Sequence, residues 1–123
     1  DGGQVLDGNT DISTATKTVE IETARLKDYL QQGIDFLKID IEGAEVVVIE
    51  DCKDFLENVQ QIFIEFHSTI NKRQQLDSIL SILANNNFRY FIESVTLFND
   101  RPFINRKSIS NFDNLLSIYA YKY

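Results

Sequence analysis

Two short segments with apolar residues at both odd and even positions constrain the fold of this chain most. Residues 34–41 read IDFLKIDI, and their apolar side chains fall on both sides of an extended strand. Residues 61–67 read QIFIEFH and have the same property. A strand that is apolar on both sides is typical of a parallel sheet that helices cover on both faces. The two segments therefore predict an α/β fold built on a mainly parallel sheet.

The rest of the chain after residue 41 alternates between helical and extended periodicity. Residues 72–86 form the clearest amphipathic pattern, with leucine and isoleucine recurring every three or four positions, and the run of three asparagines at its end predicts the helix stop. The other expected elements are a helix over 44–49, one or two helical turns over 54–59, a strand over 88–95, a loop over 97–112 and a strand over 115–121. Because the last strand follows a loop, we expect it to be an antiparallel strand at the edge of the sheet.

The start of the chain is less regular. Residues 1–16 are rich in Gly, Asp, Thr and Ser, and we expect a loop or a frayed segment. Residues 17–23 alternate apolar and polar side chains, which predicts a short half-buried strand. Residues 26–30 predict a short helix that Thr23 caps and that Gly33 closes in a left-handed conformation.

Composition excludes several classes of protein. The 123 residues suffice for one domain, and 43% are hydrophobic, which argues against disorder. A formal net charge of −7 argues against a general nucleic-acid-binding protein, and no apolar run approaches the roughly 20 residues of a membrane helix. The single Cys52 excludes an internal disulfide and a cysteine-based zinc site, and it suits a reducing, cytoplasmic location. Since the chain has no Met and begins at Asp1, we expect it to be a piece of a longer protein.

Polar side chains stand where the two doubly apolar strands end. Asp40 and Glu42 end the first strand, and Glu65 and His67 end the second. Neighbouring parallel strands lie ~4.8 Å apart, and ligands bind beyond their carboxyl ends, so we expect these four side chains to share one rim of the sheet. Such a rim can bind a cation, orient a polar substrate or transfer a proton, and His67 is the natural candidate for a general base.

Simpler interpretations of these residues stay open. Asp40 and Glu42 can cap the helix that follows them, because acidic side chains favour a helix N-terminus. Glu65 can form a structural ion pair with Lys38, and His67 can be an ordinary surface or hydrogen-bonded residue. Cys52 is expected to be an inert, small apolar residue.

The segment IDFLKIDIEGAE, residues 34–45, resembles the hallmark segment of the FkbM family of S-adenosylmethionine-dependent methyltransferases. The resemblance extends over residues 17–121, with supporting stretches at 19–30, 62–67 and 76–90, where Asn87 replaces a glycine. It implies a class I methyltransferase fold, a Rossmann-like, mainly parallel seven-stranded sheet with a reversed last strand. It also implies transfer of a methyl group from S-adenosylmethionine to a hydroxyl of a sugar or natural product.

Carried onto this chain, the resemblance matches its motif positions with Lys38, Asp40, Glu42, Glu65 and His67. The roles expected of them follow from the chemistry of their side chains. His67 is the expected base, oriented by Glu65. Asp40 and Glu42 bind the acceptor or stabilise the cationic donor, with Asp40 assigned to the cofactor, and Lys38 is assigned to the substrate. A divalent metal such as magnesium on Asp40, Glu42 and Glu65 is an alternative, although no metal ligand is assigned.

The chain lacks two features that the resemblance leads one to expect. Neither a glycine-rich turn after a first strand nor an acid after a second strand is present. We therefore expect residues 17–123 to be the C-terminal half of a methyltransferase domain, with about four of its seven strands. Such a piece should bind S-adenosylmethionine poorly, be inactive alone, and self-associate through its open edge and uncovered face.

Two other functions remain open at this level. One is a non-catalytic interaction module that uses the open sheet edge to pair with a partner. The other is a metal-dependent hydrolase that uses the same acidic rim. No nucleic-acid or membrane partner is expected, and a small molecule or saccharide is the expected acceptor.

Overall fold

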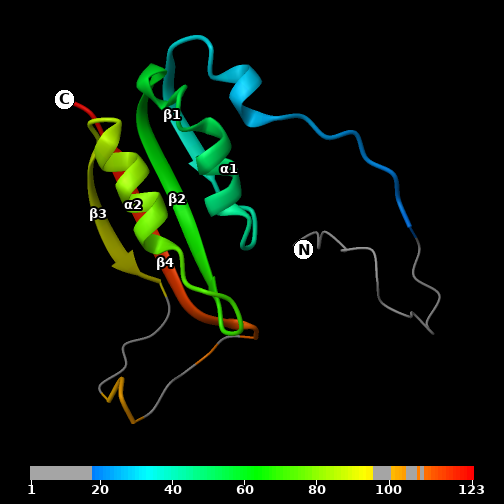
Figure 1. Cartoon of the computed structure of the whole chain (residues 1–123), viewed down its shortest axis with the longest axis vertical. Coiled ribbons are helices and arrows are strands. Elements are labelled where there is room, and N and C mark those ends of the chain that lie inside the picture. The colour runs from blue at the N-terminus through cyan, green and yellow to red at the C-terminus, as the bar shows by residue number, and fades with distance from the viewer. Residues whose placement is uncertain (1–17, 96–100, 105–107, 109) are drawn as a thin grey trace.

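The computed structural model describes residues 18–95, 101–104, 108 and 110–123, which form a four-stranded mixed sheet with both α-helices on one face (Figure 1). In chain order the elements are η1 (Leu26–Tyr29), β1 (Ile34–Ile39), α1 (Glu45–Cys52), η2 (Leu56–Asn58), β2 (Val59–Thr69), α2 (Leu76–Asn85), β3 (Arg89–Ser94) and β4 (Phe112–Tyr121). The α/β class expected from the sequence is confirmed. The loop expected over residues 1–16 lies outside the described residues.

The strands follow the order β1-β2-β4-β3 across the sheet. β1 and β2 pair in parallel, whereas β4 is antiparallel to both of its neighbours. Consequently β1, β2 and β3 share one direction and β4 alone is reversed. The expectation that the last strand forms the edge is wrong, because β4 lies between β2 and β3. Its buried Leu116, Ile118 and Ala120 face apolar residues of β2, which explains why an inner position suits it.

The hydrophobic core lies between the sheet and the two α-helices. Ile62 and Ile64 of β2 occupy the centre of the buried face, and Ile79 and Leu83 of α2 are fully buried. Ile49 of α1 and the thiol of Cys52 are also inaccessible to solvent. Burial raises the pKa of the Cys52 thiol, which keeps it protonated and fits an inert apolar role.

The opposite face of the sheet is uncovered among the described residues, contrary to the expectation that β1 and β2 are covered on both faces. Phe36 is 59% exposed and Phe91 is 50% exposed. Aromatic rings cover one another here: Phe91 stacks on Tyr119 with ring centroids 4.7 Å apart, and Phe63 meets Tyr119 edge-on at 5.2 Å. The sequence pattern thus predicted correctly that both faces of the sheet carry apolar side chains. The described helices cover only one of these faces.

The segment before β1 differs from the expectation. Residues 18–23 are not a strand, and Val19 and Ile21 are exposed, because alternation forms a strand only beside a hydrogen-bonding neighbour. The expected short helix is a single 3₁₀ turn, η1, which no side chain caps. Gly33 does not adopt a positive φ, so the predicted left-handed closure is wrong.

The helices are short, and their ends follow the local sequence. α1 has 8 residues and α2 has 10, and no helix in the described part of the chain is long and apolar enough to cross a bilayer. The expected stop after α2 is confirmed: Asn86 ends the helix and Asn87 has a φ of 62°. Asparagine tolerates this left-handed conformation, which explains how it stands where the resemblance has glycine.

Candidate active site

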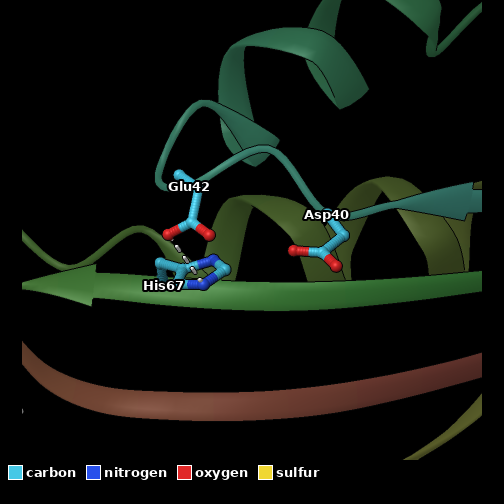
Figure 2. Close-up of side chains that lie close together, drawn as sticks. All are labelled: Asp40, Glu42 and His67. Carbon is cyan, nitrogen blue, oxygen red and sulfur yellow. Dashed lines mark ion pairs between the residues drawn. The ribbon is translucent and has the colours of Figure 1, made fainter. Parts of the chain in front are cut away.

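The carboxyl ends of β1 and β2 form one rim of the sheet, as the sequence predicted. The two strands run side by side in the same direction, with Ile39 opposite Ile64. The loop that leaves β1 therefore passes beside the second half of β2, and Figure 2 shows Asp40 and Glu42 above His67. We call the cluster of Asp40, Glu42 and His67 the rim cluster.

The loop between β1 and α1 owes its shape to two successive residues in the left-handed region. Glu42 has a φ of 57° and Gly43 a φ of 101°. A non-glycine residue rarely adopts such a φ, and at Gly43 the value suits glycine far better than any residue with a Cβ. This turn directs the Glu42 side chain toward β2, where Glu42 Oε2 lies 3.6 Å from His67 Nε2.

Substitution of Gly43 measures how much this left-handed turn contributes to the free energy of unfolding. A Cβ at Gly43 would meet nothing closer than 3.9 Å, so Gly43→Ala changes the backbone preference without a clash. We expect Gly43→Ala to lower the free energy of unfolding by about 1–2 kcal/mol. Gly33→Ala is the matched control, because Gly33 lies in open space without a positive φ, and it should be neutral or slightly stabilising. Equal urea midpoints for the two variants would contradict the assigned role of the turn.

Glu45, the first residue of α1, holds this loop and His67 together. Its side chain is 1% exposed, and its Oε1 accepts hydrogen bonds from the backbone N–H of Gly43 at 2.9 Å and of Ile41 at 3.3 Å. The same oxygen lies 3.0 Å from His67 Nδ1. A carboxylate that accepts three donors at a helix N-terminus is stabilised by the hydrogen bonds and by the helix dipole.

The His67 ring is fixed in one orientation. Its side chain is 6% exposed, and its ring lies 5.0 Å from that of Phe112. Nδ1 contacts two acceptors, Glu45 Oε1 and the backbone carbonyl of Glu65 at 3.1 Å. Since both partners accept, Nδ1 carries the proton and donates it. The lone pair of a neutral ring is then on Nε2, which faces the rim cluster.

The remaining predicted site residues lie near the rim with other partners. Lys38 Nζ forms an ion pair with Asp40 Oδ2 at 3.1 Å, so the alternative in which Lys38 pairs with Glu65 is wrong. The Glu65 carboxylate is half-buried and does not reach His67; the Glu65 backbone carbonyl does. The expected orientation of His67 by the Glu65 side chain is thus corrected, because the carboxylate in contact is that of Glu45. The helix-cap alternative also fails, since no side chain caps α1 at Ala44.

Sequence reasoning missed Glu45 as a site residue. Glu45 entered the sequence analysis only as part of the segment 34–45 and of the predicted helix over 44–49, with no role of its own. The available signal was its place directly after Gly43-Ala44, where a tight turn can fold a first-turn carboxylate back onto the loop amides.

A pocket of about 590 Å³ lies beside the rim, between α1, the outer edge of β1 and the segment before η1. Its walls are mainly apolar and include Ile39, Ile41, Val47 and Val48. An ion pair between Arg25 and Asp51 lies at its border, and the hydrogen bond from Arg25 lowers the pKa of the Asp51 carboxyl. The pocket therefore combines an apolar wall with the charged side chains of Arg25, Lys38 and Asp51.

Comparison with known protein families assigns the chain to one of them. The family model described as methyltransferase FkbM domain matches residues 2–90. The chain belongs to the FkbM methyltransferase domain family. Searches of curated proteins and of solved structures found no match.

The described residues of this FkbM-domain chain fit a sulfonium methyl donor only in part. Asp40 and Glu42 supply negative charge and the adjacent pocket supplies apolar surface. The only glycines among the described residues, Gly33 and Gly43, stand on either side of β1, and no glycine-rich turn follows a strand there. These residues alone therefore do not make a complete donor site.

Proposed function

We propose that this FkbM-domain protein is an S-adenosylmethionine-dependent O-methyltransferase and that the rim cluster handles the acceptor hydroxyl of a sugar or natural product. One observation carries the proposal: Glu45 holds the buried His67 ring so that Nε2, with its lone pair, faces Glu42 and Asp40. Membership of a methyltransferase family supports the reaction class. A buried imidazole backed by a carboxylate supports proton transfer at this rim.

His67 is the proposed general base. The donor supplies a methyl group on a sulfonium, and the acceptor oxygen must lose its proton as it forms the new bond to carbon. Nε2 of His67 takes that proton, and the imidazolium that forms is stabilised by Glu45 Oε1 at 3.0 Å from Nδ1. The carbonyl of Glu65 holds the same nitrogen, so the ring stays in place while its charge changes.

Asp40, Glu42 and Lys38 are proposed to bind the acceptor. Glu42 is 50% exposed at the mouth of the rim, where its carboxylate can accept hydrogen bonds from neighbouring hydroxyls of a polyol. The Lys38–Asp40 pair places a donor beside an acceptor, a combination that suits sugar hydroxyls. Asp40 is also the residue we assign to the positive charge of the donor. Glu65 is half-buried on β2, the strand that carries His67. Its carboxylate is proposed to contribute negative charge to the rim without contacting the His67 ring.

The proposal is tested by methyl transfer. The protein encoded by the complete reading frame is incubated with S-adenosylmethionine labelled in the methyl group and a panel of monosaccharides and hydroxylated aromatics. Mass spectrometry should find the label on an acceptor oxygen, and calorimetry should find donor binding. Absence of labelled product across the panel despite donor binding contradicts the assignment. If the protein instead hydrolyses esters when metal is added and no methyl donor is present, the metal-dependent hydrolase alternative replaces the methyltransferase assignment.

A further inference from the structure

The rim cluster contains three side chains of the types that ligate metals, at a spacing close to that of a metal site. One ligand atom each from Asp40, Glu42 and His67 lies within 4.8 Å of the other two (Figure 2). Two of these residues come from the loop after β1 and the third from the neighbouring strand β2, so the sheet itself brings them together.

The buried histidine provides the second, independent observation. His67 is 94% buried as a side chain, and both contacts that fix its ring use Nδ1. The ion-pair contact of Nε2 is with the Glu42 carboxylate at 3.6 Å, which is too long for a hydrogen bond. A histidine that donates Nδ1–H to a carboxylate and presents Nε2 to further ligands has the arrangement that orients imidazoles in metal sites.

The distances suit one ion after a small adjustment. Ligand atoms bonded at about 2.1 Å to the same ion lie at most about 4.2 Å apart. The cluster therefore has to contract by roughly half an ångström, and the Asp40 and Glu42 side chains, 29% and 50% exposed, have room to do so. Lys38 has to release Asp40 Oδ2, which it contacts at 3.1 Å.

We propose that Asp40, Glu42 and His67 bind a single divalent transition-metal ion, Mn²⁺ or Zn²⁺. One imidazole nitrogen with two carboxylate oxygens favours such an ion over Mg²⁺ or Ca²⁺, which prefer oxygen alone. The exposed side of the cluster leaves coordination positions for water or for an acceptor hydroxyl. A bound ion occupies the Nε2 lone pair. His67 therefore cannot accept a proton at Nε2 while it ligates the ion. The site goes beyond the proposed function and does not require it.

The test is a titration of the full chain with MnCl₂ and with ZnCl₂, followed by calorimetry and by NMR of the ring of His67, the only histidine. We expect one saturable site, with Mn²⁺ broadening and Zn²⁺ shifting the ring signals. Glu42→Gln and Asp40→Asn should each weaken binding by at least about tenfold. Lys38→Met should tighten it. Asp35→Asn, the same charge change at the exposed opposite end of β1, should leave binding unchanged.

Several results would overturn the site. These are the absence of saturable binding, equal weakening by Asp35→Asn and Glu42→Gln, or binding that leaves the His67 ring signals unchanged. The titration contains no methyl donor. A protein that binds the ion but transfers no methyl group therefore refutes only the proposed function, whereas one that transfers the group but binds no ion refutes only this site.

Discussion

His67→Ala is expected to lower kcat for methyl transfer by about 10²- to 10⁴-fold, the usual contribution of a positioned general base. The loss should fall on kcat with little change in KM, because the proposed proton transfer to Nε2 occurs only as the acceptor oxygen attacks. No other described side chain presents a neutral basic nitrogen at the rim cluster, so the described residues offer no substitute for His67.

The variant must first be shown to fold, since His67 also packs against Phe112. His67→Gln, which fills more of the space, provides the comparison, and circular dichroism with thermal melting checks both variants. Steady-state rates are measured from pH 6 to 9 with the labelled donor. Turnover by a folded His67→Ala variant that matches the wild type across this range would exclude His67 as the base.

The rim was predictable from the sequence because its determinants are local. Extended runs of apolar residues define β1 and β2, and a connection of about 20 residues that contains a helix joins parallel neighbours. Polar residues at the ends of two such strands must then meet at one edge. The parallel pairing of Ile39 with Ile64 follows from these rules.

Features that depend on distant partners were not predictable. The position of β4 between β2 and β3 depends on strand pairing between residues far apart in sequence, such as Ile64 and Ile118. Residues 18–23 have the alternation of a strand but no neighbour among the described strands. The exposed ring of Phe36 shows likewise that an apolar pattern does not specify what covers it.

The same distinction explains the partner of His67. Glu65 and His67 are two positions apart on one strand, so their side chains leave the same face roughly 6.5 Å from each other, too far for a hydrogen bond between them. Glu45 is 22 positions away in sequence, yet the left-handed turn at Glu42 and Gly43 folds it back to 3.0 Å. Spacing along a strand thus suggested the wrong carboxylate, and loop geometry supplies the right one.

Glu45→Ala is expected to lower the free energy of unfolding by about 3 kcal/mol, the largest stability effect at this site. The substitution leaves the N–H groups of Gly43 and Ile41 without their side-chain acceptor. It also leaves the Nδ1–H of His67 with only the Glu65 carbonyl as its acceptor. A buried donor that loses its partner costs about 1–3 kcal/mol, and a cavity forms where the side chain was. Glu50→Ala, on an exposed position of the same helix, should change stability by no more than about 0.5 kcal/mol.

Glu45→Gln separates the structural role of Glu45 from its effect on the histidine. Its amide oxygen can still accept from the loop, so we expect it to recover most of the stability lost in Glu45→Ala, as measured by urea denaturation. It carries no charge, however, and an imidazolium at His67 would lose the stabilisation that the carboxylate provides. We therefore expect the ¹⁵N signals of the single histidine ring to change in Glu45→Gln although the fold is retained. If those signals are the same in the two proteins from pH 6 to 9, Glu45 holds the loop but does not position His67 for proton transfer.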